Sequence, residues 1–146
     1  MAYMSERTDE VMLLFQDKFA CSQSVLAPFA EKYGLDKTLA LRLACALGTG
    51  AKSGGVCGAV SGAGIVISLK YGHCSKEDLD GKKNCSDKML EFVRIFRERN
   101  IYIDCRDILG TNINIPGERD KVLETIQERC PSMVRSAAEI LEELGY

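Results

Sequence analysis

The sequence lacks the features that mark several large protein classes. No apolar stretch reaches the roughly 18 residues that a membrane-spanning helix needs, and the longest candidate, Ala59 to Leu69, contains glycine and serine. Positive charge is not in excess, because the formal net charge is −2. The sequence therefore predicts neither insertion into a membrane nor the usual electrostatic binding of nucleic acid.

The first twenty residues carry four acidic side chains and no long apolar segment, which is not the pattern of a secretory signal peptide. We therefore expect a cytoplasmic protein. A length of 146 residues with 46% apolar residues is enough for one hydrophobic core and too short for two ordinary domains. No linker or repeat divides the chain, so we expect a single domain over residues 1–146.

Apolar residues recur at helical spacing along most of the chain. This pattern predicts an all-α fold, a single compact helical domain of about six to seven helices. Asp36, Ser86 and Asp104 are expected to begin helices, and Pro131 is expected in the first turn of the last one. The expected helical segments are 9–19, 22–33, 36–47, 57–71, 86–96, 105–109, 118–129 and 131–144.

A glycine-rich loop, Gly48 to Gly55, is expected before the central helix, which begins at Cys57. The first half of that helix consists of small residues. Small side chains lower the helix propensity, but they let another backbone, a cofactor or a second subunit come close. A homo-oligomer is therefore an open alternative.

The chain has seven cysteines, but it has no Cys-x-x-Cys pair and only one histidine. These absences argue against a thioredoxin-type motif, a zinc ribbon, the usual ferredoxin cysteine runs and a histidine-rich metal centre. An odd count without an export signal favours metal binding, redox chemistry or packing over a disulfide framework. Any site must be assembled from distant segments. The cysteines are Cys21, Cys45, Cys57, Cys74, Cys85, Cys105 and Cys130.

Cys57, Cys105 and Cys130 are each expected at a helix N-terminus, and Cys21 lies at a junction between two helices. Unpaired N–H groups and the positive end of the helix dipole favour a thiolate there, so we expect lowered thiol pKa values. Cys45 lies between two alanines in the middle of an expected helix and is interpreted as a core residue.

Four blocks of the sequence, in the same order, resemble the C_GCAxxG_C_C family of redox proteins. The central block, Cys57-Gly-Ala-Val-Ser-Gly62, has the Cys-Gly-Ala-x-x-Gly signature. Cys21 precedes Ser-Gln-Ser and an apolar pair, Cys105 begins Cys-Arg-Asp-Ile-Leu-Gly, and Cys130 precedes the last expected helix. The resemblance extends from Cys21 to Leu144.

The resemblance implies that the four cysteines Cys21, Cys57, Cys105 and Cys130 form one redox site. It implies no substrate. Because related modules occur attached to electron-transfer proteins, it favours an iron–sulfur cluster held by the four thiolates. The backbone N–H groups at Gly54, Gly55 and Gly58, and the side chain of Arg106, are then expected to donate to the cluster.

Two alternatives remain open at the level of the sequence. The same cysteines can cycle between dithiol and disulfide without a metal, with Cys57 attacking and another family cysteine such as Cys105 resolving. Four thiolates also satisfy zinc, in a non-catalytic domain that binds the metal or a partner protein. The sequence does not decide whether the chain is an oxidoreductase or an electron carrier. Either redox role requires a partner redox protein.

Overall fold

The computed structural model describes residues 5–146, and in this part of the chain eight α-helices and no β-strands are present. The all-α fold is therefore confirmed. Short 3₁₀ turns follow α2 and α3. The helices are α1 (Glu6–Gln16), α2 (Cys21–Ala30), α3 (Lys37–Ala44), α4 (Gly58–Tyr71), α5 (Leu79–Asn100), α6 (Cys105–Leu109), α7 (Glu118–Lys121) and α8 (Leu123–Glu143).

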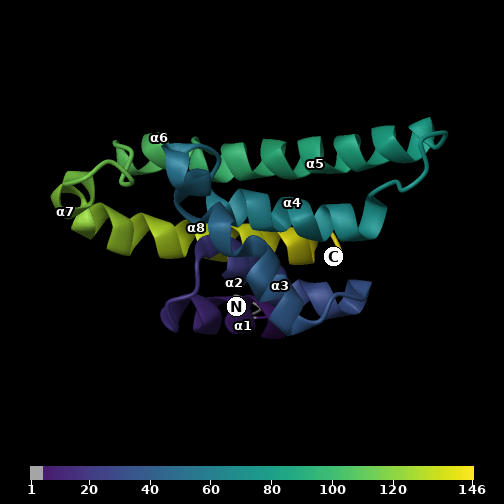
Figure 1. Cartoon of the computed structure of the whole chain (residues 1–146), viewed down its shortest axis with the longest axis horizontal. Coiled ribbons are helices and arrows are strands. Elements are labelled where there is room, and N and C mark those ends of the chain that lie inside the picture. The colour runs from purple at the N-terminus through teal and green to yellow at the C-terminus, as the bar shows by residue number, and fades with distance from the viewer. Residues whose placement is uncertain (1–4) are drawn as a thin grey trace.

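The long helices lie in layers, as Figure 1 shows. α5 forms one side, α4 and α8 run through the middle, and α1 to α3 form the opposite side. α2 packs against α1, α3, α4 and α8, so it is at the centre of the helix contacts. The short helices α6 and α7 lie together at one end (Figure 1). Of the described helices, none is long and apolar enough to cross a membrane.

Aromatic and branched aliphatic side chains from α2, α4, α5 and α8 fill the core between these layers. Phe92 and Phe96, both expected on the core face of their helix, are fully buried and stack with ring centroids 6.0 Å apart. Burial of such side chains is the main favourable contribution to folding. The other large, fully buried side chains include Phe29, Leu26, Ile67, Ile140 and Leu141.

Two expected helix boundaries are wrong. α5 begins at Leu79 instead of near Ser86, because Asp78 caps it by accepting a hydrogen bond from the Gly81 N–H at 2.9 Å. α8 runs without a break through Pro131, which was expected at the start of a separate helix. The apolar residues of α8 from Met133 to Leu141 are buried, and Ile126 and Cys130 before the proline pack partly against the core, so packing outweighs the cost of a proline within a helix.

The small residues of α4 bring two helices into close contact. A Cβ atom added at Gly62 would lie 2.6 Å from the carbonyl oxygen of Ser22 on α2, and one at Gly58 would lie 3.2 Å from the Cβ of Cys21. Side chains at these positions would hold the helices apart. The expectation that this segment lets another backbone approach is confirmed, and the backbone belongs to the first turn of α2.

The glycine-rich loop before α4 adopts a left-handed turn. Thr49, Gly50, Ala51 and Lys52 all have φ between 54° and 66°, a conformation that costs non-glycine residues roughly 1–2 kcal/mol each. Asn114 holds the turn, since its amide group donates to the carbonyl of Thr49 at 3.0 Å and accepts from the Thr49 hydroxyl at 2.8 Å. The strained turn is therefore fixed from outside the loop.

We expect Asn114→Ala to release this turn. The substitution removes both hydrogen bonds to Thr49 and leaves the strain of the turn uncompensated, so the free energy of unfolding should fall by about 1–3 kcal/mol. Urea unfolding followed by circular dichroism measures the change. Asn84→Ala, at an exposed asparagine of α5, is the control. Equal stability of the two variants would show that Asn114 does not hold the loop.

Candidate four-cysteine site

Cys57 and Cys105 are brought together by an isolated antiparallel bridge between Val56 and Asp104. The N–H of Cys57 donates to the carbonyl of Ile103, and the N–H of Cys105 donates to the carbonyl of Gly55, both at 2.7 Å. The two cysteines are thus diagonal neighbours across this short antiparallel bridge. Cys57 immediately precedes α4, and Cys105 is the first residue of α6.

Cys21 is held at the first residue of α2 by its sequence neighbours. The hydroxyl of Ser22 donates to the carbonyl of Ala44 at 2.7 Å, and the amide group of Gln23 donates to the carbonyl of Leu41 at 2.8 Å. The Gln23 oxygen also accepts the N–H of Ala20, which precedes the helix. These bonds fix the first turn of α2 to α3. Gly58 and Gly62 of α4 let the same turn of α2 approach α4 closely, next to Cys57.

Cys130 comes from the middle of α8, not from a helix start as expected. Its thiol is the hydrogen-bond partner of the Cys21 thiol. Pro131, the next residue, has no N–H, so the carbonyl of Gln127 lacks its usual helical donor. α8 therefore passes the site with Cys130 directed toward α2.

The four family cysteines influence one another electrostatically. The pKa of Cys21 is raised first by its hydrogen bond to Cys130 and then by burial, and the charges of Cys57 and Cys105 raise it further. The charge of Cys130 also raises the pKa values of Cys57 and Cys105. The four cysteines therefore lie within electrostatic range of one another where α2, α4, α6 and α8 meet, and their role as one site stays a prediction.

The expected lowering of the thiol pKa values is wrong for Cys57 and Cys105, and the pKa of Cys21, at the first residue of α2, is raised as well. Burial raises the pKa of Cys57 to about 12 and that of Cys105 to about 11. The N–H groups of Ala59 and Val60 oppose this at Cys57, although neither makes a complete capping bond to the sulfur. Loss of hydration outweighs the helix N-terminus here.

Cys130 is the exception, because its pKa is lowered. The main cause is the hydrogen bond that the Cys21 thiol donates to its sulfur, and the positive charge of Arg119 adds to the effect. Burial acts in the opposite direction. The opposite directions at Cys21 and Cys130 have one main cause, which is the interaction between the two thiols.

The other predicted site residues differ in their placement. Gly58 packs against Cys21, and Gly55 binds the backbone of Cys105, whereas Gly54 has a left-handed φ of 73° beside Asn112. The Arg106 side chain is 60% exposed and lies 3.8 Å from the Asp104 carboxylate. Donation by Arg106 and by the glycine N–H groups to a bound group stays a prediction.

The three remaining cysteines are not brought into the site. Cys45, expected in the core, is exposed at the C-terminal end of α3, because α3 turns its alanines Ala40 and Ala44 inward instead. Cys74 is exposed before α5, and Cys85 is half-buried within α5.

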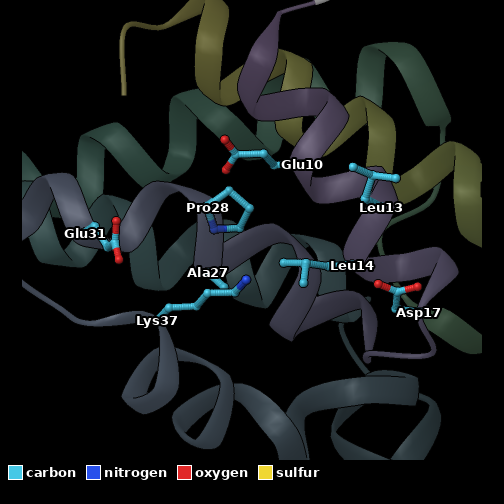
Figure 2. A pocket seen from close by; sticks show the side chains of 8 residues that line it. All are labelled: Glu10, Leu13, Leu14, Asp17, Ala27, Pro28, Glu31 and Lys37. Carbon is cyan, nitrogen blue, oxygen red and sulfur yellow. The ribbon is translucent and has the colours of Figure 1, made fainter.

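Two open hollows lie on the surface. A groove of about 390 Å³ between α1, α2 and the start of α3 has an apolar floor that includes Leu14 and Pro28 and a rim with three carboxylates (Figure 2). None of the four cysteines lines it. A second cleft of about 360 Å³ opens between the end of α5, α6 and α8, where Ile108 and Arg129 lie close in sequence to Cys105 and Cys130.

These observations define an all-helical protein with a buried site of four cysteines. The chain belongs to the C_GCAxxG_C_C family: the family model, described as "Putative redox-active protein (C_GCAxxG_C_C)", matches residues 19–144. The predicted family is thus confirmed, and so is a redox-active class of protein. Comparisons with curated proteins and with solved structures found no match.

Sequence reasoning did not find the residues that position the cysteines. Ser22, Gln23, Asn114 and Arg119 act through hydrogen bonds or charge across the fold. Polar residues of these types are common in loops and at helix ends, so the sequence offered no signal beyond the position of Ser22 and Gln23 next to Cys21.

Proposed function

We propose that the four cysteines bind an iron–sulfur cluster and that the protein transfers single electrons. The observation that supports this best is the convergence of four thiols from four helices, with mutual electrostatic influence, on a largely buried site. Four cysteine thiolates are the usual ligand set of such clusters. When bound, a cluster supplies the one-electron chemistry.

Cluster binding requires the cysteine side chains to rearrange. In residues 5–146 no group of three or more histidine, cysteine or acidic side chains is arranged closely enough to hold one metal ion. A cluster binds its cysteines through several iron atoms, so its ligand sulfurs stand further apart than those around zinc. Rotation of the Cys21 and Cys130 side chains away from each other would open the space between the four sulfurs.

The surrounding chain favours a thiolate-bound group in two ways. The N–H groups of Ala59 and Val60 face the sulfur of Cys57, where they oppose the effect of burial on a negative charge. Burial of Cys57 and Cys105 shields that part of the site from water. Neutral thiols with raised pKa values must lose protons on binding, so cluster binding should strengthen with rising pH.

The test is the iron and acid-labile sulfide content, with the visible spectrum, of protein purified and reconstituted without oxygen. Wild-type protein should contain both elements near the stoichiometry of a cluster. Cys57→Ser removes a ligand and should lose most of the iron and the visible absorption. Cys45→Ser, at an exposed cysteine outside the site, should load as the wild type does.

Absence of iron and sulfide after reconstitution of the fully reduced protein would refute the cluster. Stoichiometric zinc that depends on Cys57 would indicate the zinc-binding alternative instead.

A further inference from the structure

One face of α1 lines the groove of about 390 Å³ between α1, α2 and the start of α3. Glu10, Leu13, Leu14 and Asp17 stand at positions i, i+3, i+4 and i+7, so they follow one another on the same side of α1 over about two turns. Leu13 is 59% exposed, although its neighbour Leu14 is buried. This face therefore has a partly uncovered apolar middle with a carboxylate at each end.

The opposite wall of the groove is α2, and the two helices are fastened to each other beside it. Ala27 and Pro28 line the groove from α2, and the guanidinium of Arg7 on α1 donates to the carbonyl of Pro28 at 2.7 Å. The same guanidinium lies 5.6 Å from the centre of the fully buried Phe29 ring. Because these contacts hold the two walls in place, a partner can bind in the groove at little cost in reordering of this chain.

The rim of the groove carries an excess of negative charge. Glu10, Asp17 and Glu31 contribute three carboxylates, and Lys37 contributes one ammonium group. None of these four side chains forms an ion pair within residues 5–146. Figure 2 shows Glu31 and Asp17 at opposite sides of the view, with Glu10 between them. Carboxylates spread along a groove in this way favour several cations on one partner over a single bound ion.

A partner that fits the groove must combine an apolar stripe with positive charge. An amphipathic helix does so over two turns, when it carries apolar side chains at i+3 and i+4 between cations at i and i+7. We propose that the groove is the docking site for a basic amphipathic helix of a one-electron redox protein. Apolar side chains of that helix cover Leu13 and Leu14, and its lysine or arginine side chains reach Glu10 and Asp17.

The exchange of electrons with this partner rests on the proposed function, whereas the docking itself does not. Cys21 is the first residue of α2, and Ala27 lies further along the same helix. At about 1.5 Å per residue, the two are separated by roughly 9 Å along the helix axis. A partner in the groove is therefore one short helix away from Cys21. One electron then passes from the partner's redox group to the oxidised cluster, which is reduced, or returns in the reverse direction.

The docking experiment uses the full-length, reduced, iron-free protein. The probe is a fluorescein-labelled helical peptide of leucine and lysine, with the leucines on one face. A peptide with glutamate in place of lysine is the control. Fluorescence anisotropy should show saturable binding of the lysine peptide, with a Kd on the order of 10 µM at low ionic strength, and no binding of the glutamate peptide. Because salt screens exposed charges, the affinity should fall several-fold at high ionic strength.

Three variants locate the binding. Leu13→Gln removes the exposed apolar side chain and should weaken binding about tenfold. Leu90→Gln, the same substitution at a leucine that is 65% exposed on α5, should bind as the wild type does. Lys37→Glu reverses the positive charge on the rim and should tighten binding about threefold. It places a negative charge in the first turn of α3, where the helix dipole favours it. Circular dichroism establishes that each variant retains the helical fold.

The electron-exchange experiment uses protein reconstituted with iron and sulfide. The same lysine peptide carries a viologen group, and the reduced viologen radical gives one electron to the oxidised cluster. Stopped-flow bleaching of the viologen should be about tenfold faster with the wild type than with Leu13→Gln, because docking raises the effective concentration of the donor. Equal rates would show that the groove takes no part in electron exchange.

Absence of saturable binding of the lysine peptide would overturn the proposal, as would equal affinity for wild type and Leu13→Gln. A dimer in sedimentation that Leu13→Gln dissociates would show that a second copy occupies the groove, which also overturns it. Failure of the proposed function gives a different result. If the peptide binds in the groove but the protein takes up no iron and sulfide, the cluster is refuted and the docking surface remains. If the cluster loads but the peptide does not bind, the docking surface is refuted and the cluster remains.

Discussion

Gly62→Ala should destabilise the protein and reduce cluster loading, because the added methyl group would lie 2.6 Å from the carbonyl oxygen of Ser22. That atom belongs to the backbone of α2, so the two helices must move apart. Overpacking of this kind costs about 1–3 kcal/mol, which exceeds the gain of about 1 kcal/mol from replacing glycine by alanine within a helix. The movement also carries Cys21 away from Cys57. Chemical unfolding and iron content measure the two effects.

Gly64→Ala provides the matched control. It lies on the same helix and gains the same helix propensity, but its added methyl group meets only the flexible end of the Met89 side chain, at 3.3 Å. We expect this variant to be as stable as the wild type or more stable, and to bind iron normally. If Gly62→Ala were equally stable and equally loaded, the close crossing of α2 and α4 would have no role in forming the site.

The helical fold was predictable because it follows from local patterns of apolar residues. Helical spacing of apolar residues predicted α5 as a core helix, with Phe92 and Phe96 facing inward as observed. The small residues between Gly58 and Gly62 predicted a close approach. The resemblance predicted that four of the seven cysteines form one site, and this stays a prediction; in the structure the charges of Cys57, Cys105 and Cys130 all raise the pKa of Cys21.

The errors have a common cause: at these positions tertiary packing outweighs the local sequence signals. Pro131 is a local signal for a helix start, but Ile126 and Cys130 before it pack partly against the core and the apolar residues after it are buried, so the helix continues. Alanines on both sides of Cys45 suggested a core position, but α3 turns Ala40 and Ala44 inward and leaves the cysteine exposed. The thiol pKa values depend on how deeply each sulfur is buried. A sequence pattern that predicts the start of a helix does not predict this burial.

The pairing of Cys21 with Cys130 was beyond the sequence for a related reason. The two residues are roughly a hundred positions apart, and no spacing rule links them. Their contact follows from the packing of α2 against α8. The sequence favoured Cys57 as an attacking thiol because it begins a helix, whereas its burial and its pKa of about 12 leave it protonated at neutral pH.

In the metal-free dithiol alternative, protein oxidised to a Cys21–Cys130 disulfide should be markedly more stable to unfolding than the reduced protein. A Cys21–Cys130 disulfide closes a loop of roughly a hundred residues, and loss of chain entropy in the unfolded state then contributes about 4–5 kcal/mol. For a chain of this length the melting temperature should rise by on the order of 10 °C.

Differential scanning calorimetry of the iron-free protein, before and after treatment with 2-hydroxyethyl disulfide, measures this stabilisation. The Cys130→Ser variant is the control, and its melting temperature should not respond to the reagent, because the exposed cysteines of this chain can form only mixed disulfides that close no loop through α8. A large stabilisation requires a bond between distant segments, so its size reports which cysteines are joined. A rise that persists in Cys130→Ser, or an oxidised wild type that melts at or below the temperature of the reduced protein, would show that the α2–α8 contact does not become a covalent link.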